Sequence, residues 1–207
     1  MRRSWAGTIG MIFIVIASSC STSGTTPNVS PSSSAFTEEN ADAMENTVLD
    51  ALMDIVSGDR DGLLSLTLNE DRQFLAAVNR QDNAGDLMVD RLSASLVGAF
   101  GPTGISKLRV SYVGTDHDYY RVDVSPSASG PGLPILLNIE KSKIDLLASF
   151  AGYVASDLFA AAQADPEVHA MLRSRLHALK TADMLALPQL RSQPGQLRAL
   201  IRSLESG

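Results

Sequence analysis

The chain has 207 residues, of which 44% are apolar and 5% aromatic, and its formal net charge is −6 at pH 7. The apolar content is typical of a globular protein and excludes a wholly disordered chain. The acidic balance argues against a nucleic-acid-binding surface, because phosphate contacts require clustered lysine and arginine. With one cysteine, Cys20, the chain has no second thiol for an internal disulfide.

The first residues have the layout of an export signal. Arg2 and Arg3 precede an apolar stretch from Ala6 to Ala17, and small residues then lead to Cys20. At ~1.5 Å per residue such a helix covers ~18 Å, whereas the hydrocarbon core of a bilayer is ~30 Å thick. Residues 1–19 are therefore predicted to be a signal peptide rather than a membrane-spanning helix.

The string Ile16-Ala17-Ser18-Ser19-Cys20 resembles the lipobox-type signal of bacterial lipoprotein precursors, with Ala17 where that family usually has leucine. The resemblance implies that Cys20 is diacylated on sulfur, becomes the new N-terminus and is usually acylated there too. Two or more acyl chains hold a protein stably at a bilayer. The implied location is the outer surface of the cell membrane, or the outer membrane in an organism that has two. The alternative is an ordinary signal peptide that is cut near this cysteine and discarded.

Residues 20–36 are predicted to be a disordered tether behind the acylated cysteine. The stretch from Ser21 to Ala35 is rich in Ser, Thr and Pro, and it has no charge and one branched apolar residue, Val29. Such a segment cannot bury enough apolar surface to fold. A flexible chain of this length spans ~20 Å, enough to lift a folded domain clear of lipid headgroups. Residues 37–207 are predicted to form that single domain.

Helical patterns open the predicted domain. Thr37 is expected to cap a helix with an apolar stripe at spacings of three and four residues, which ends at Gly58. The stripe consists of Ala41, Met44, Val48, Leu52 and Ile55. A short buried turn is expected at 63–68. Two further helices are predicted, one capped by Asn69 and one opened by Asp86 that ends at Gly101-Pro102.

The periodicity then changes to two residues, which is typical of half-buried strands. Three strands are predicted at 108–112, 120–124 and 135–139, with a turn at 114–118 and a Ser/Gly/Pro-rich loop at 126–134. Short connections between consecutive strands favour an antiparallel meander.

Helices are predicted again after the strands. One apolar stripe runs from Ile144 to Phe159, and Asp165-Pro166 is a strong start signal for the next helix. A last short helix is expected around Leu197 to Leu204. Helices, a short meander and helices again make the expected fold class α+β.

The best sequence candidate for a catalytic site is Asp116-His117-Asp118-Tyr119-Tyr120, since carboxylates on both sides of an imidazole can adapt it to acid–base work. A plain turn is favoured there, because alternation would place His117 opposite both aspartates. His169 and His177 are expected on one helix, eight residues and ~12 Å apart, too far to share a metal ion. No metal, cofactor or catalytic residue is therefore predicted, and Cys20, as the lipidation site, is the one site residue that the sequence predicts.

These patterns favour a non-enzymatic, lipid-anchored envelope lipoprotein that binds a protein partner or supports an envelope complex, without contact to nucleic acid. A carrier of an apolar ligand or lipid, in a pocket between the sheet and the helix from residue 144 to 162, is one alternative. An exported hydrolase centred on His117 is another. Residues 168–204 hold six basic side chains and one acidic side chain. That imbalance indicates either a solvated helix face, which is favoured, or a surface for an anionic partner.

Overall fold

A computed structural model describes residues 38–80, 83–101, 104–126, 132–185 and 192–206. Residues 36–207 form one compact unit. The described part contains helices, then a four-stranded antiparallel sheet, then helices again, so the α+β prediction is confirmed. Cys20, the signal segment, the tether and the expected cap at Thr37 lie outside the described residues.

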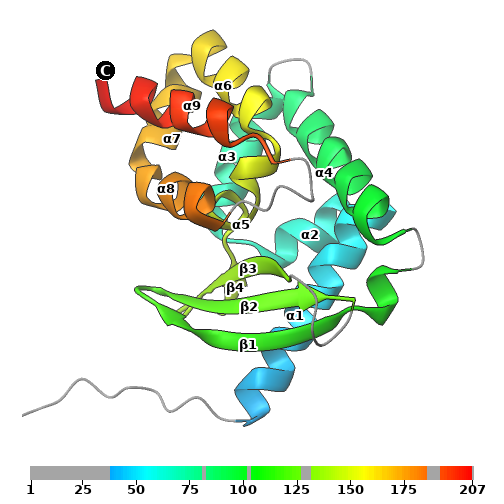
Figure 1. Cartoon of the computed structure of the whole chain (residues 1–207). Coiled ribbons are helices and arrows are strands. Elements are labelled where there is room, and N and C mark those ends of the chain that lie inside the picture. Colours follow the sequence, from blue (N-terminus) through cyan, green and yellow to red (C-terminus); the bar gives the residue numbers. More distant parts are fainter. Residues whose placement is uncertain (1–37, 81–82, 102–103, 127–131, 186–191, 207) are drawn as a thin grey trace, which may run out of the picture. The chain divides into compact units, whose positions relative to one another are not determined.

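Four helices precede the sheet (Figure 1): α1 (Glu38–Ser57), α2 (Arg60–Leu66), α3 (Asn69–Asn79) and α4 (Ala84–Phe100). The predicted stripe of α1 is buried from Met44 to Ile55, with side chains no more than 5% exposed. Gly58 ends α1 at a φ of 76°, a conformation that glycine adopts without steric cost. Three of the leucines expected to form a short turn, Leu63, Leu64 and Leu66, belong instead to α2, and Leu68 directly precedes α3. Asp59 caps α2 by accepting a hydrogen bond from the Gly62 N–H.

The sheet has the strand order β1-β2-β3-β4, with each neighbouring pair antiparallel. Its strands are β1 (Arg109–Asp116), β2 (Tyr119–Ser125), β3 (Leu133–Asn138) and the short β4 (Lys143–Ile144). The three predicted strands are confirmed, whereas β4 is too short to give a periodic signal. Helix α1 contacts β1 and β4, and α5 (Leu146–Phe150) contacts β3 (Figure 1). Buried side chains of β2 and β3, among them Val122, Val124 and Ile135, therefore join the sheet to the helical core.

The stripe from Ile144 to Phe159 does not form one helix. It divides into β4, α5, a 3-10 turn at Ala151–Tyr153 and α6 (Ala155–Ala164), and the helical halves are bent by 102°. Gln193 stabilises the bend: its N–H donates to the Gly152 carbonyl, and its side-chain oxygen accepts from the Ser156 N–H and hydroxyl. Periodicity predicted the apolar face but could not reveal this distant partner.

After α6, the described residues contain three more helices: α7 (Pro166–Ser174), α8 (Leu176–Leu185) and α9 (Pro194–Ser206). The predicted start at Asp165-Pro166 is confirmed, because the Asp165 carboxylate accepts from the Glu167 N–H. Within the described residues, no individual helix has the length and apolar character needed to cross a bilayer. The bent pair formed by Leu146–Tyr153 and Ala155–Ala164 has the required length and apolar character only when its two halves are counted together.

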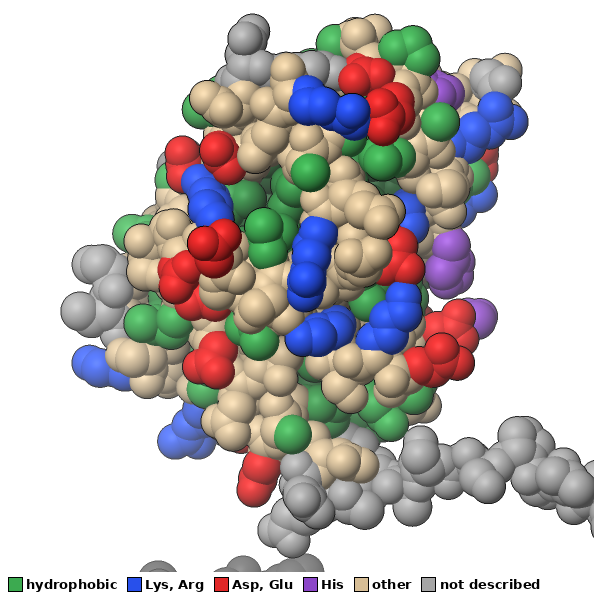
Figure 2. All heavy atoms as spheres, turned by 180° about the vertical axis from the view of Figure 1, so that it is seen from behind, with side chains coloured by type: hydrophobic (Ala, Val, Ile, Leu, Met, Phe, Trp, Pro, Cys, Tyr) green, Lys and Arg blue, Asp and Glu red, His purple; other side chains and the backbone are tan. Residues whose placement is uncertain are grey.

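The face of the domain shown in Figure 2 carries mixed charges rather than one broad basic patch. Figure 2 shows basic and acidic side chains interspersed on the side opposite to that of Figure 1. Two basic side chains of the C-terminal helices pair with acidic ones, Lys180 with Glu205 and Arg198 with Asp183. These ion pairs support the interpretation of the basic C-terminal segment as a solvated helix face.

Candidate functional site

Two buried carboxylates share one arginine near the centre of the domain. Asp71 on α3 and Asp145 at the start of α5 are 1% and 0% exposed. Arg175, at the junction of α7 and α8, donates from Nη1 to Asp71 Oδ1 at 3.2 Å and from Nη2 to Asp145 Oδ1 at 2.7 Å. The three side chains therefore join segments more than 100 residues apart in sequence.

Neutral donors complete the coordination of both carboxylates. The Leu146 N–H donates to Asp71 Oδ2, and the Ala148 N–H donates to Asp145 Oδ1. The Tyr119 hydroxyl, from β2, donates to Asp145 Oδ2 at 2.7 Å. All four carboxylate oxygens thus accept a hydrogen bond from the protein. We call Asp71, Tyr119, Asp145 and Arg175 the buried cluster.

Two carboxylates and one guanidinium leave an excess negative charge when both acids are ionised. Burial, and then repulsion from Asp145, raise the pKa of Asp71 to about 7, against the attraction of Arg175 and the Leu146 N–H. Although burial works in the opposite direction, the attraction of Asp145 and Asp71 raises the pKa of Arg175. Burial and the neighbouring Asp145 also raise the pKa of Tyr119. Of the four side chains in the buried cluster, Asp71 is therefore the one expected to gain or lose a proton near neutral pH.

Two exposed histidines lie beside the buried cluster. The ring of His177, on α8, stacks against Tyr119 with 6.5 Å between centroids, and His117 meets His177 edge to face at 5.7 Å. His117 Nδ1 lies 2.6 Å from Asp116 Oδ1. The expectation that His117 points away from Asp116 is wrong, because His117 occupies the hairpin turn with a φ of 51° and does not follow strand alternation. In Figure 2 histidine and acidic side chains lie together at one edge of the surface.

His169 and His177 do not share a helix, contrary to expectation. Helix α7 ends before Arg175, and the Arg175 carbonyl accepts from the Leu179 N–H as α8 begins. The break directs the guanidinium into the buried cluster and His177 toward Tyr119. Among the described residues, no three His, Cys, Asp or Glu side chains are arranged to hold a metal ion. Of the groupings described here, His117 with His177 and Asp116 comes nearest to the catalytic site that the hydrolase hypothesis requires.

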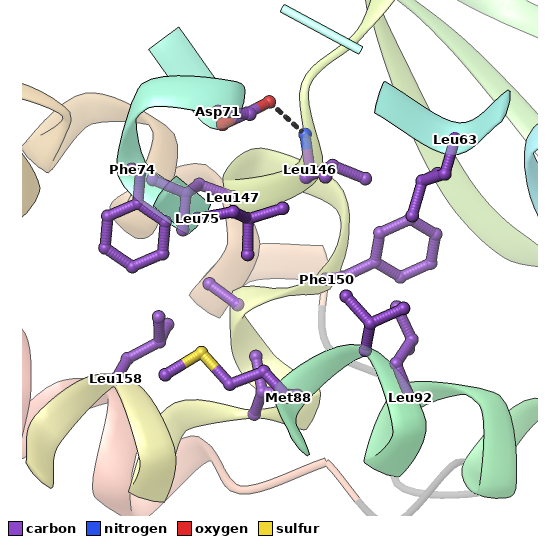
Figure 3. A pocket seen from close by; sticks show the side chains of 13 residues that line it. Leu63, Asp71, Phe74, Leu75, Met88, Leu92, Leu146, Leu147, Phe150 and Leu158 are labelled. Atoms are coloured by element: carbon purple, nitrogen blue, oxygen red, sulfur yellow. Dashed lines mark hydrogen bonds between the residues drawn. The ribbon is translucent and has the colours of Figure 1, made fainter. Parts of the chain in front are cut away.

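A cavity of about 50 Å³ borders Asp71 (Figure 3). Its walls come from α2, α3, α4, α5 and α6, and include Leu63, Phe74, Met88, Leu92, Phe150 and Leu158. Asp71 lies at its margin, turned toward the Leu146 N–H (Figure 3). This cavity is bounded by helices rather than by the sheet, and it has room for a few water-sized molecules. The carrier hypothesis would require it to widen considerably.

The sequence patterns missed Asp71, Asp145 and Arg175 as site residues, although one signal was present, whereas Tyr119 lies within the predicted string from Asp116 to Tyr120. Arg175 continues the apolar series of Val168 and Leu172, and Asp71 lies three residues before buried Phe74. A charged residue within an apolar stripe indicates a paired, buried charge. No protein-family model, curated protein or solved structure matches this chain.

Proposed function

We propose that this chain is a bacterial lipoprotein in which residues 1–19 are removed and Cys20 is acylated. The acyl chains anchor the protein at the outer surface of the cell membrane, or at the outer membrane of an organism with two. The observation that carries the proposal is the position of Cys20, directly after a charged start, an apolar stretch and three small residues. The Ser/Thr/Pro-rich residues that follow act as a tether to the domain.

We assign the domain a non-enzymatic role in binding a protein partner or supporting an envelope complex. The buried cluster favours such a role, because its carboxylates accept hydrogen bonds at every oxygen and are at most 1% exposed. A general base needs access to a substrate proton. Asp71 and Asp145 instead fasten α3, α5, β2 and the α7–α8 junction to one another.

The lipid anchor is tested with a labelled fatty acid in cells that express the full chain. Wild-type protein and a Ser21→Ala control should incorporate the label, whereas Cys20→Ala should not. Ser21→Ala changes the adjacent residue and leaves the thiol in place. Equal labelling of Cys20→Ala and wild type, or no label on the wild type, would contradict the anchor.

The non-enzymatic role is tested by capturing partners from solubilised envelopes. The full chain should recover the same envelope proteins in repeated experiments, and a variant with the exposed pair removed, His117→Ala with His177→Ala, should recover them equally. Failure to recover any reproducible partner would count against the binding role. A hydrolytic activity of the full chain that this double variant loses would replace it with the hydrolase hypothesis.

A further inference from the structure

Strand β1 forms an edge of the sheet, and six of its eight residues are exposed. Among the described residues, β2 is its one strand neighbour, so no strand pairs with the other edge of β1. None of its eight residues is buried, whereas β2 and β3 are largely buried. Tyr112 and Val113, at the middle of the strand, are 37% and 53% exposed. An edge of this length with apolar side chains at its centre is a template for pairing with another strand.

The ends of β1 carry opposite charges on the same face of the sheet. Arg109 lies opposite Ser125 of β2, and Asp116 lies opposite Tyr119. Ser125 and Tyr119 are six residues apart, so strand alternation places both on one face. Arg109 and Asp116 are seven residues apart and would face opposite sides of a regular strand. The irregularity between Tyr112 and Gly114 supplies the extra residue that brings both charges to one face.

We propose that β1 pairs antiparallel with β1 of a second copy of this chain, about a two-fold axis between Tyr112 and Val113. In this register Arg109 lies opposite Asp116 of the partner subunit, and the symmetric pair forms at the other end. A two-fold axis perpendicular to the sheet keeps each face of one copy on the same side as the matching face of the other. Arg109 and Asp116 can therefore meet across the axis only because both lie on the same face. Tyr112 and Val113 of both copies meet at the centre and lose exposed apolar area.

The charges at the strand ends distinguish a second copy from an unrelated strand. Arg109 forms no ion pair with any other residue that the structure describes, and Asp116 is 55% exposed beside His117. An antiparallel second copy of the strand therefore places its Asp116 opposite Arg109 and its Arg109 opposite Asp116. The area of one strand pair is smaller than the ~800 Å² per partner of a standard interface, which predicts a weak dimer. If the proposed lipid anchor holds, confinement at a membrane raises the local concentration and favours the dimer.

A charge-swap experiment tests the pairing by sedimentation equilibrium of the full chain in mild detergent. All samples carry Cys20→Ala, so the result does not depend on acylation. The reference chain should dimerise with increasing concentration. Arg109→Asp or Asp116→Arg alone places like charges opposite one another at both ends, and each should raise the dimer Kd about tenfold. The double variant restores opposite charges and should return Kd to within about threefold of the reference.

A matched pair of lysine variants tests the strand edge separately from the charges. Val113→Lys introduces a charge at the centre of the pairing, as natural edge strands do to prevent association, and should abolish the dimer. Leu87→Lys, on α4, replaces an apolar residue of similar exposure, 57%, and should dimerise like the reference. A monomer at all concentrations up to about 1 mM would overturn the proposal. Equal Kd values for the reference and both single charge variants, or a double variant as weak as the singles, would also overturn it.

Discussion

Replacing Asp71 with asparagine should change how the stability of the domain depends on pH. The pKa of Asp71 is about 7 in the folded domain, against an ordinary value of 3.8. Because the folded value is the higher one, the stability linked to this group is greatest below pH 3.8. It is lost as pH rises to about 7, where the folded state must ionise a buried acid.

The expected size follows from this difference. One pKa unit corresponds to 1.36 kcal/mol, so the difference between 3.8 and about 7 gives roughly 4 kcal/mol across the whole range and on the order of 2 kcal/mol between pH 5 and 7. Asp71 is 1% exposed, so solvent screens the effect little. Asparagine does not ionise, so it removes the pH dependence that Asp71 contributes. Its amide has one acceptor oxygen and cannot accept from both the Leu146 N–H and Arg175. The Asp71→Asn variant should therefore be less stable at acidic pH and have a flatter profile.

Urea unfolding of residues 36–207, followed by circular dichroism from pH 5 to 8, measures this directly. The free energy of unfolding of wild type relative to Asp71→Asn should rise by roughly 1 kcal/mol for each pH unit of acidification from 7 to 5. Asp61→Asn, at an exposed position on α2, controls for the loss of one negative charge. If the unfolding free energies of wild type and Asp71→Asn changed with pH in parallel, the raised pKa of Asp71 would be refuted. A difference that grows as pH rises would refute it as well.

Three further substitutions test two contacts of the buried cluster and the cap of α7, each by the free energy of urea unfolding at pH 7. Arg175→Met leaves two buried carboxylates without their cation and should cost about 3–5 kcal/mol; a loss below ~1 kcal/mol would mean that the guanidinium does not hold them. Tyr119→Phe keeps the ring against His177 but removes the donor to Asp145, and should cost about 1–3 kcal/mol, whereas unchanged stability would disprove that hydrogen bond. Asp165→Ala removes the cap of α7 and should cost about 1 kcal/mol, and no loss would show that the cap is unimportant.

The sequence predicted those elements whose signals are local. The stripe of α1, its stop at Gly58 and the start of α7 at Asp165-Pro166 depend on side chains within one or two helical turns. Alternation likewise located the three longer strands. These features were predictable because each depends on spacing and on a cap or turn residue next to it.

The remaining features depend on partners that are distant in sequence. The bend between α5 and α6 is stabilised by Gln193, more than 30 residues away, and the break before α8 coincides with the pairing of Arg175 with Asp71 and Asp145. Hairpin geometry placed His117 beside Asp116, against the alternation rule. Asp71 and Arg175 were detectable only as charged residues within apolar stripes, and that pattern does not identify which charges pair.

The proposed lipid anchor is tested most directly by the intact mass of the mature N-terminus after extraction from membranes. The mature polypeptide should begin at Cys20 and carry the mass of a diacylglyceryl group, with or without an additional amide-linked acyl chain. An N-terminus at any other residue, or an unmodified Cys20 in protein recovered from the membrane, would contradict it.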